Sequence, residues 1–297
     1  MNLHIHHDSP TTPSGISSRL YLLLILLLCG AGIFCAWRLQ DTLFIAPAIG
    51  SVIVLLLLSK ATLSDSQRWR SWLGIFQFLA SWLVFPLFKA IHLISTHSYD
   101  AQLLAFDRWL WGGVGATEYV KVLEAPWLSE LMSSCYLAFY FIILGPVIAY
   151  GFKRHSASSK GFFYGLMLMY LVGFTGYLLV PAAGPYVYAP ALFPYPPQGG
   201  AITAFLVGLV AQGGTGMDVF PSLHCGISLY ILGYLTFQRH WIIAGLLLPV
   251  VVGLILATLY LRYHYGVDLL AGTLVAGSVL TWLNRQGYFR RSTGTLI

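Results

Sequence analysis

The sequence predicts an all-α protein, a polytopic membrane helix bundle of about eight transmembrane spans that includes a six-span core. Of its 297 residues, 58% are hydrophobic and only 9% are charged. A water-soluble domain carries roughly 25% charged residues, so this composition cannot cover a soluble surface of this size. A soluble enzyme is therefore excluded.

Eight apolar runs approach the length of about 20 residues that a helix needs to cross the hydrocarbon core. They lie at 20–37, 43–59, 71–94, 131–152, 161–180, 222–238, 241–261 and 264–284. The sixth run is the weakest of them, because Ser222 and His224 occupy its outer end. No cleavable signal peptide is evident around the first run, which is expected to stay attached to the chain.

The basic residues of the short loops predict the orientation. With the N-terminus in the cytoplasm, the inner side receives eleven of the 16 Lys and Arg residues: Arg19, Lys60, Arg68, Arg70, Lys153, Arg154, Lys160, Arg239, Arg285, Arg290 and Arg291. By the positive-inside rule, the tails 1–19 and 285–297 are expected to be cytoplasmic. As a separate expectation, the membrane is a bacterial inner membrane. The net charge of +6 does not indicate a nucleic-acid partner, because such binders cluster Lys and Arg on one solvated face.

Between the two tails the chain divides into three parts. Residues 20–94 are expected to form peripheral spans that lead into the core, and 95–130 an extracytoplasmic interfacial segment rich in tryptophan. Residues 131–284 are expected to form the membrane core. Within the core, the many prolines and glycines of 181–220 predict an irregular loop or cap and not a helix.

Ionisable groups at membrane depth are costly and are usually functional or paired, and the first such group is the stretch 218–224, Asp-Val-Phe-Pro-Ser-Leu-His. Pro221 suits a first helical turn, where Ser222 can accept hydrogen bonds from free backbone N–H groups. A helix N-terminus also favours a bound phosphate. Taken alone, the stretch fits a helix cap with an interfacial His224 better than it fits a phosphate site.

The second group is the stretch 261–268, Leu-Arg-Tyr-His-Tyr-Gly-Val-Asp. If the last span starts near His264, then His264 and Asp268 lie one helical turn apart on the same face. A carboxylate bonded to one imidazole nitrogen fixes the tautomer and makes the other nitrogen more nucleophilic. Taken alone, a buried His–Asp pair that stabilises the bundle fits equally well.

The two groups converge, because the topology derived from loop charges places His224 and His264 at the same depth on the outer side. Two histidines, Asp268, Ser222 and Arg262 at a single mouth indicate phosphoryl transfer without a metal. The four cysteines lie in apolar segments with no metal-binding spacing, and the chain offers no carboxylate cluster. No metal ion and no cofactor is therefore expected.

Both groups resemble signature motifs of the type-2 phosphatidic acid phosphatase superfamily. The stretch 221–224 resembles the Pro-Ser-Gly-His motif with Leu223 in place of Gly, and His264 and Asp268 match the His-x-x-x-Asp end of another motif. The Ser-Arg that opens the latter motif is replaced by Ala257 and Thr258. The resemblance covers roughly residues 131–284.

A further motif of the superfamily, Lys-x6-Arg-Pro, is not recognisable, because Gly173 holds the Lys position and Val180 the Arg position. Two replacements for the missing basic residues are proposed. Arg262 is the first, because it lies two residues from His264. Lys89 is the second, because a lone Lys near the outer end of an apolar span needs an anionic partner, although a snorkelling Lys gives the same pattern.

The residues that differ from the superfamily motifs are similar to those of the inositol phosphorylceramide synthase-like branch, which also has a Gly-Pro-Tyr loop before these motifs. Tyr186 of that loop and Ser222 are therefore candidates for substrate binding. The resemblance implies that His264 attacks phosphorus to form a phosphohistidine, that His224 acts as general acid, and that Asp268 orients His264.

The resemblance implies a membrane lipid phosphate as substrate and phosphatase or headgroup phosphotransferase activity at the extracytoplasmic face. Hydrolysis and transfer to a lipid or polyol acceptor share the first half-reaction, so the motifs do not separate them. An inositol phosphorylceramide synthase-like transferase without hydrolase activity is one alternative. A non-catalytic protein that binds or flips lipids is the other.

Overall fold

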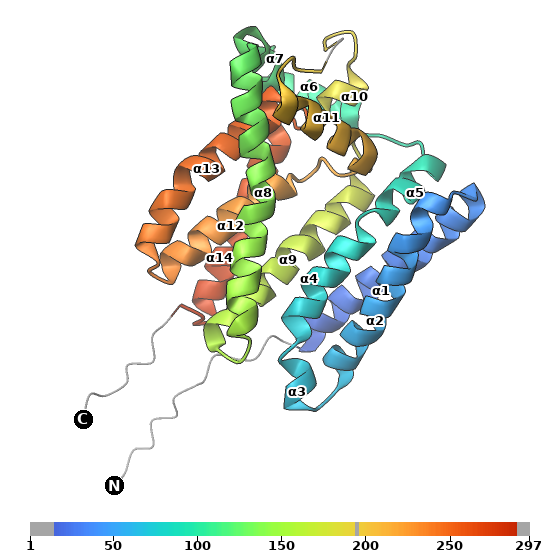
Figure 1. Ribbon diagram of the computed structural model, residues 1–297, viewed down its shortest axis with the longest axis vertical. Helices are drawn as coiled ribbons and strands as arrows, with labels where there is room; N and C mark the ends of the chain where they lie inside the picture. Colours follow the sequence, from blue (N-terminus) through green and yellow to red (C-terminus); the bar gives the residue numbers. More distant parts are fainter. Residues whose placement is uncertain (1–14, 194–195, 290–297) are drawn as a thin grey trace.

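The structure, a computed structural model, describes residues 15–193 and 196–289, and no strand occurs in these ranges. Long helices run side by side, and short helices cover their upper end (Figure 1). The prediction of an all-α polytopic bundle is confirmed. The α-helices are α1 Gly15–Leu39, α2 Ile45–Leu63, α3 Gln67–Arg70, α4 Leu73–Val84, α5 Leu87–Ile94, α6 Asp100–Leu110, α7 Ala116–Val120, α8 Pro126–Phe152, α9 Ala157–Leu179, α10 Pro185–Tyr188, α11 Ala201–Gly213, α12 Leu223–Phe237, α13 Trp241–Tyr260 and α14 Gly266–Arg285.

Seven of the eight predicted spans form helical segments that are long and apolar enough to cross a membrane. The exception is 222–238, which forms α12, a helix of 15 residues. At 1.5 Å per residue α12 is about 22 Å long, short of the roughly 30 Å hydrocarbon core. Most of its side chains are buried by neighbouring helices, so α12 does not depend on a long lipid-facing apolar surface.

Helices α12 and α14 form one of the closest pairs in the bundle. Gly272 makes this approach possible, because a Cβ atom there would clash with the backbone oxygen of Ser222. The backbone N–H of Ser222 donates to the carbonyl oxygen of Asp268 over 3.1 Å. This contact fixes the start of α12 beside the first turn of α14, which is where the two polar stretches of the sequence lie.

Helices α1 to α5 form a layer beside the other long helices (Figure 1). The layer joins them mainly through α4 and α9. Trp82 on α4 donates its indole N–H to the Tyr170 hydroxyl over 2.8 Å, and Gln77 contacts the Met167 sulfur at 2.9 Å. These polar contacts hold the layer against α9.

The two long segments at the upper end contain short helices. Residues 95–130 form α6 and α7, with exposed aromatic rings such as that of Trp109, and then begin α8. The prediction of an irregular segment throughout 181–220 is wrong for α10 and α11. Of these two, α11 has 13 residues and lies after the last proline of 181–197, in an apolar stretch that nothing prevents from forming a helix.

The first described residues of α1 and the last of α14 lie at the lower end of the bundle (Figure 1). The hydroxyl of Tyr164 on α9 contacts Ser17 at 2.9 Å and its ring packs on Trp282, which places the three helix ends together. The outer parts of the predicted tails, with Arg290 and Arg291, lie outside the described residues, as does Pro194.

Candidate active site

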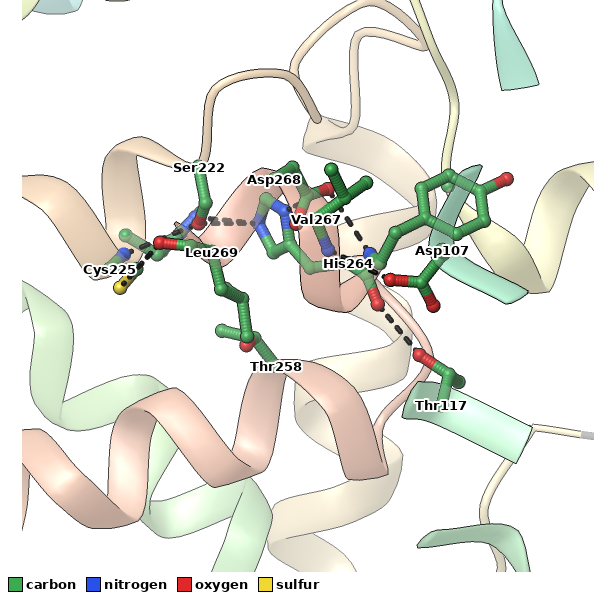
Figure 2. A network of polar contacts seen from close by, with 12 residues as sticks. Asp107, Thr117, Ser222, Cys225, Thr258, His264, Val267, Asp268 and Leu269 are labelled. Atoms are coloured by element: carbon green, nitrogen blue, oxygen red, sulfur yellow. Dashed lines mark hydrogen bonds and ion pairs between the residues drawn. The ribbon is translucent and has the colours of Figure 1, made fainter. Parts of the chain in front are cut away.

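His264 lies in the turn between α13 and α14. The carbonyl oxygen of Thr258 accepts from the backbone N–H groups of Tyr263 and His264 at 3.0 and 3.2 Å, which ends α13. The His264 Nδ1 atom lies 3.2 Å from the Asp268 Oδ2 atom, which also accepts the backbone N–H of Tyr265 at 3.1 Å. Figure 2 shows His264 between Ser222 and Asp268. The side chain of His264 is thus oriented by a fully buried carboxylate.

His224 is the second residue of α12 and faces His264 from the opposite side. Its Nδ1 atom lies 3.4 Å from the Nε2 atom of His264. Its own Nε2 atom lies 3.2 Å from the Tyr136 hydroxyl, and the rings of Tyr136 and Phe139 pack against it. One ring nitrogen of each imidazole therefore faces the other imidazole. The remaining nitrogen has its own partner, which is Asp268 for His264 and Tyr136 for His224.

Ser222 caps α12 and also reaches the histidine pair. Its Oγ atom accepts the backbone N–H of Cys225 at 3.3 Å and lies 3.4 Å from the Nε2 atom of His264 (Figure 2). Ser222 has an extended backbone and a short hydroxyl side chain, which are the usual features of a helix N-cap residue. The free N–H groups of a helix N-terminus thus lie beside His264.

A cavity of about 230 Å³ opens on the two histidines. Its walls include both rings, together with Tyr136, Tyr186 on α10 and Lys89 on α5. The Lys89 Nζ atom donates to the backbone oxygen of Gln212 over 2.9 Å, so the ammonium is held at the cavity and keeps further N–H donors. Lys89 and Tyr186, which are distant in sequence, thus line the same cavity as the histidine pair.

Arg262 is placed differently from the other predicted site residues. Its side chain is 4% exposed, forms an ion pair with Glu124 and lies over the ring of Phe193 at 5.2 Å. It is not among the side chains that line the cavity of the two histidines. The backbone of Arg262 is left-handed, with φ of 68°, so the side chain of Arg262 points in a different direction from that of His264.

A second cavity, of about 320 Å³, adjoins the first and is mostly apolar. Both cavities share His224, Tyr136 and Asp218 as wall residues. Most of the other wall side chains of the second cavity are aromatic or aliphatic and come from α4, α8, α9, α11 and α12. The chamber with the histidines is thus the more polar of the two and meets a mostly apolar chamber, an arrangement that suits a ligand with a polar and an apolar part.

Two buried carboxylates of α6 hold the loops around the site, and the sequence analysis did not select them. Asp107 accepts the backbone N–H group of Val267 at 2.8 Å (Figure 2), and it accepts that of Ala116 at 2.9 Å. Asp100 accepts the backbone N–H of Gly184 at 2.9 Å and the Tyr265 hydroxyl at 2.8 Å. The two aspartates are seven residues apart on an amphipathic helix, a spacing that places both on one face. This spacing was the signal in the sequence that could have identified them.

Thr117 on α7 and Tyr136 on α8 were also missed. The Thr117 hydroxyl donates to the backbone oxygen of His264 over 2.8 Å (Figure 2), and Tyr136 contacts His224 as described above. Neither residue lies in a motif, so no local pattern pointed to it. Among the described residues, no group of three or more His, Cys, Asp or Glu could hold a metal ion, and the expectation of no metal stays a prediction.

The fold and the paired histidines define a class of helical, membrane-type proteins with a His–His–Asp constellation at one end of the bundle. The family model described as PAP2 superfamily matches residues 101–282. This match covers more than half of the chain, so the protein belongs to the PAP2 superfamily, which is the superfamily that the motifs resemble. Curated proteins and solved structures give no significant match, and none of the comparisons supports the inositol phosphorylceramide synthase-like branch.

Proposed function

We propose that this protein is an integral-membrane lipid phosphate phosphatase or lipid headgroup phosphotransferase that works through a phosphohistidine. The observation that carries the proposal is the junction of two cavities at His224. One cavity is lined by His224, His264 and Lys89, and the other is mostly apolar. A phosphate group fits the first chamber and a lipid chain fits the second.

In the first half-reaction, the Nε2 atom of His264 attacks the phosphorus in line. The bond from phosphorus to the ester oxygen breaks, and the phosphoryl group is held by His264. His224 donates a proton to the departing oxygen, so a neutral alcohol leaves. Asp268 accepts from Nδ1–H of His264 and stabilises the positive charge that develops on the ring, as its 3.2 Å distance supports.

In the second half-reaction, His224 takes a proton from water or from an acceptor hydroxyl. The oxygen of that molecule attacks the phosphohistidine, and His264 is restored. Lys89, Ser222 and the N-terminal N–H groups of α12 stabilise the equatorial oxygens. Lys89 takes this role ahead of Arg262, because the guanidinium of Arg262 is paired with Glu124 and lies outside the cavity wall.

The central test is a product assay on purified protein with a panel of lipid phosphates, with and without lipid or polyol acceptors. Free phosphate and new phospholipid products are both measured. Hydrolysis is expected, because water needs no second binding site. A headgroup-exchange product without free phosphate selects the transferase alternative, which is the outcome expected of an inositol phosphorylceramide synthase-like enzyme. Lipid binding without either product selects the non-catalytic alternative.

Replacement of Lys89 by Met should raise KM for a lipid phosphate by roughly tenfold to a hundredfold, because the substrate phosphate loses a charge-assisted hydrogen bond. Initial rates over a range of substrate concentrations measure this. Lys121→Met is the matched control, since its ammonium contacts the Leu192 backbone oxygen and the Phe193 ring and does not line the cavity. Equal effects of the two variants would argue that Lys89 acts only as a surface charge.

The site is proposed to face the extracytoplasmic side, and cysteine labelling in intact cells tests this. Ala191→Cys at the upper end should react with an impermeant thiol reagent, whereas Ala157→Cys at the start of α9 should not. Both alanines are exposed, so the two variants are matched. The unmodified chain, with its own four cysteines, sets the background. Labelling of Ala157→Cys alone would reverse the orientation.

A further inference from the structure

A third cavity, of about 270 Å³, lies at the lower end of the bundle, opposite the histidines. Its walls come from α1 to α4 on one side and from the α8–α9 turn and α9 on the other. It therefore sits between the N-terminal layer and the remaining helices. The N-terminal part of this wall lies outside the residues that match the PAP2 superfamily, so the site is separate from the proposed catalytic one.

The charged side chains in the wall of this lower cavity are all basic. They are Arg70 on α3, Arg154 in the α8–α9 turn and Lys160 on α9. The nearest acid paired with any of them, Asp65, lies 3.2 Å from Arg70 and is fully exposed. The lower cavity thus has an excess of positive charge, which favours an anionic ligand.

Two buried polar atoms point to a ligand in the same place. The Nε atom of Arg154 and the Oγ1 atom of Thr62 are buried without a hydrogen-bond partner among the described residues, and both side chains line the lower cavity. A buried donor without an acceptor is costly. The Arg154 guanidinium is held in place by the ring of Trp72, at 4.4 Å, so it does not need a ligand to be ordered.

We infer that the lower cavity is a binding site for a phosphate-bearing anion, with Arg154 and Thr62 as hydrogen-bonding partners. Phosphate oxygens accept from a guanidinium in a planar, charge-assisted geometry, and Thr62 donates its hydroxyl. Apolar walls from Leu73 and Phe163 extend the lower cavity beyond the polar groups. A phospholipid headgroup and a soluble phosphate ester share this chemistry.

The test uses the full-length protein in phosphatidylcholine nanodiscs, with phosphatidic acid added as a minor component, and counts retained phosphatidic acid by mass spectrometry. Arg154→Ala should weaken retention roughly tenfold, the loss expected for one charge-assisted hydrogen bond. Lys153→Ala is the matched control: it removes the same charge one residue away, at an exposed side chain that does not line the lower cavity. It should change retention less than twofold.

A second variant and two soluble ligands complete the experiment. Thr62→Val, which keeps the shape of the side chain, should weaken retention in the same direction and covers the case in which Arg154→Ala fails to fold. Inorganic phosphate and glycerol 3-phosphate, titrated against protein in detergent, distinguish a soluble ligand from a lipid. Binding in either arm that depends on Arg154 supports the site. Equal losses for Arg154→Ala and Lys153→Ala, or no binding of any of these anions, would overturn it.

Discussion

His264→Ala should abolish turnover of every substrate, because the proposed mechanism forms the phosphoenzyme on the Nε2 atom of this residue. Loss of a catalytic nucleophile typically lowers kcat by roughly 10⁶-fold. The measurement is kcat/KM for a lipid phosphate and for para-nitrophenyl phosphate, together with trapping of an acid-labile phosphoenzyme in the unmodified protein. His97→Ala is the matched control, since His97 is exposed and lines neither upper cavity.

The same assay separates the roles of the two histidines. His224→Ala should slow turnover of lipid phosphates, whose alkoxide leaving groups need a proton, much more than turnover of para-nitrophenyl phosphate. His264→Ala should affect both substrates alike. Near-normal activity of a folded His264→Ala protein on both substrates would remove the phosphohistidine mechanism and leave the His–Asp pair with a structural role only.

Asp268→Asn should lower kcat by roughly 10⁴-fold, by analogy with loss of the orienting aspartate in a hydrolase triad. The carboxylate of Asp268 is fully buried and lies 3.2 Å from Nδ1 of His264. An amide at this position presents either a neutral oxygen or an N–H group to the ring, so it no longer stabilises a positive imidazole. Rate measurements on lipid phosphates give the size of the loss.

The fold of the Asp268→Asn protein should survive, because the substitution removes a buried charge and keeps the volume. Thermal unfolding in detergent is therefore expected to start at or above the temperature for the unmodified protein. Asp65→Asn, at an exposed position of the lower end, controls for the removal of a charge. A folded Asp268→Asn protein with a rate within tenfold of the unmodified protein would show that Asp268 does not orient the nucleophile.

The long helices could be predicted because apolar length in a single stretch of chain is enough to define a span. Helix α12 shows the limit of this measure, since burial by its neighbours replaces contact with lipid and permits 15 residues. Helix α11 shows another limit. The prolines of 181–220 predict an irregular structure for the whole segment, although none of them lies within 201–213, where the helix forms.

The pairing of His264 with Asp268 could be predicted from local spacing, and the approach of His224 followed from the loop charges. The direction of Arg262 could not be predicted. It depends on a left-handed residue in a tight turn and on Glu124, which lies 138 positions earlier. Lys89 and Tyr186 reach the cavity through the packing of α5 and α10, which no pattern in one stretch of sequence encodes.

The bonds from α6 to the loop after α13 have a consequence for biogenesis. Asp107 is 160 positions from Val267, and Asp100 is 165 positions from Tyr265. The ribosome therefore delivers these carboxylates long before it delivers their partners. A nascent chain that ends ahead of Tyr265 can insert its earlier helices, yet each of the two carboxylates then lacks the donor that comes from this loop. The contacts that hold the histidine turn therefore form only after the start of the last helix has been synthesised.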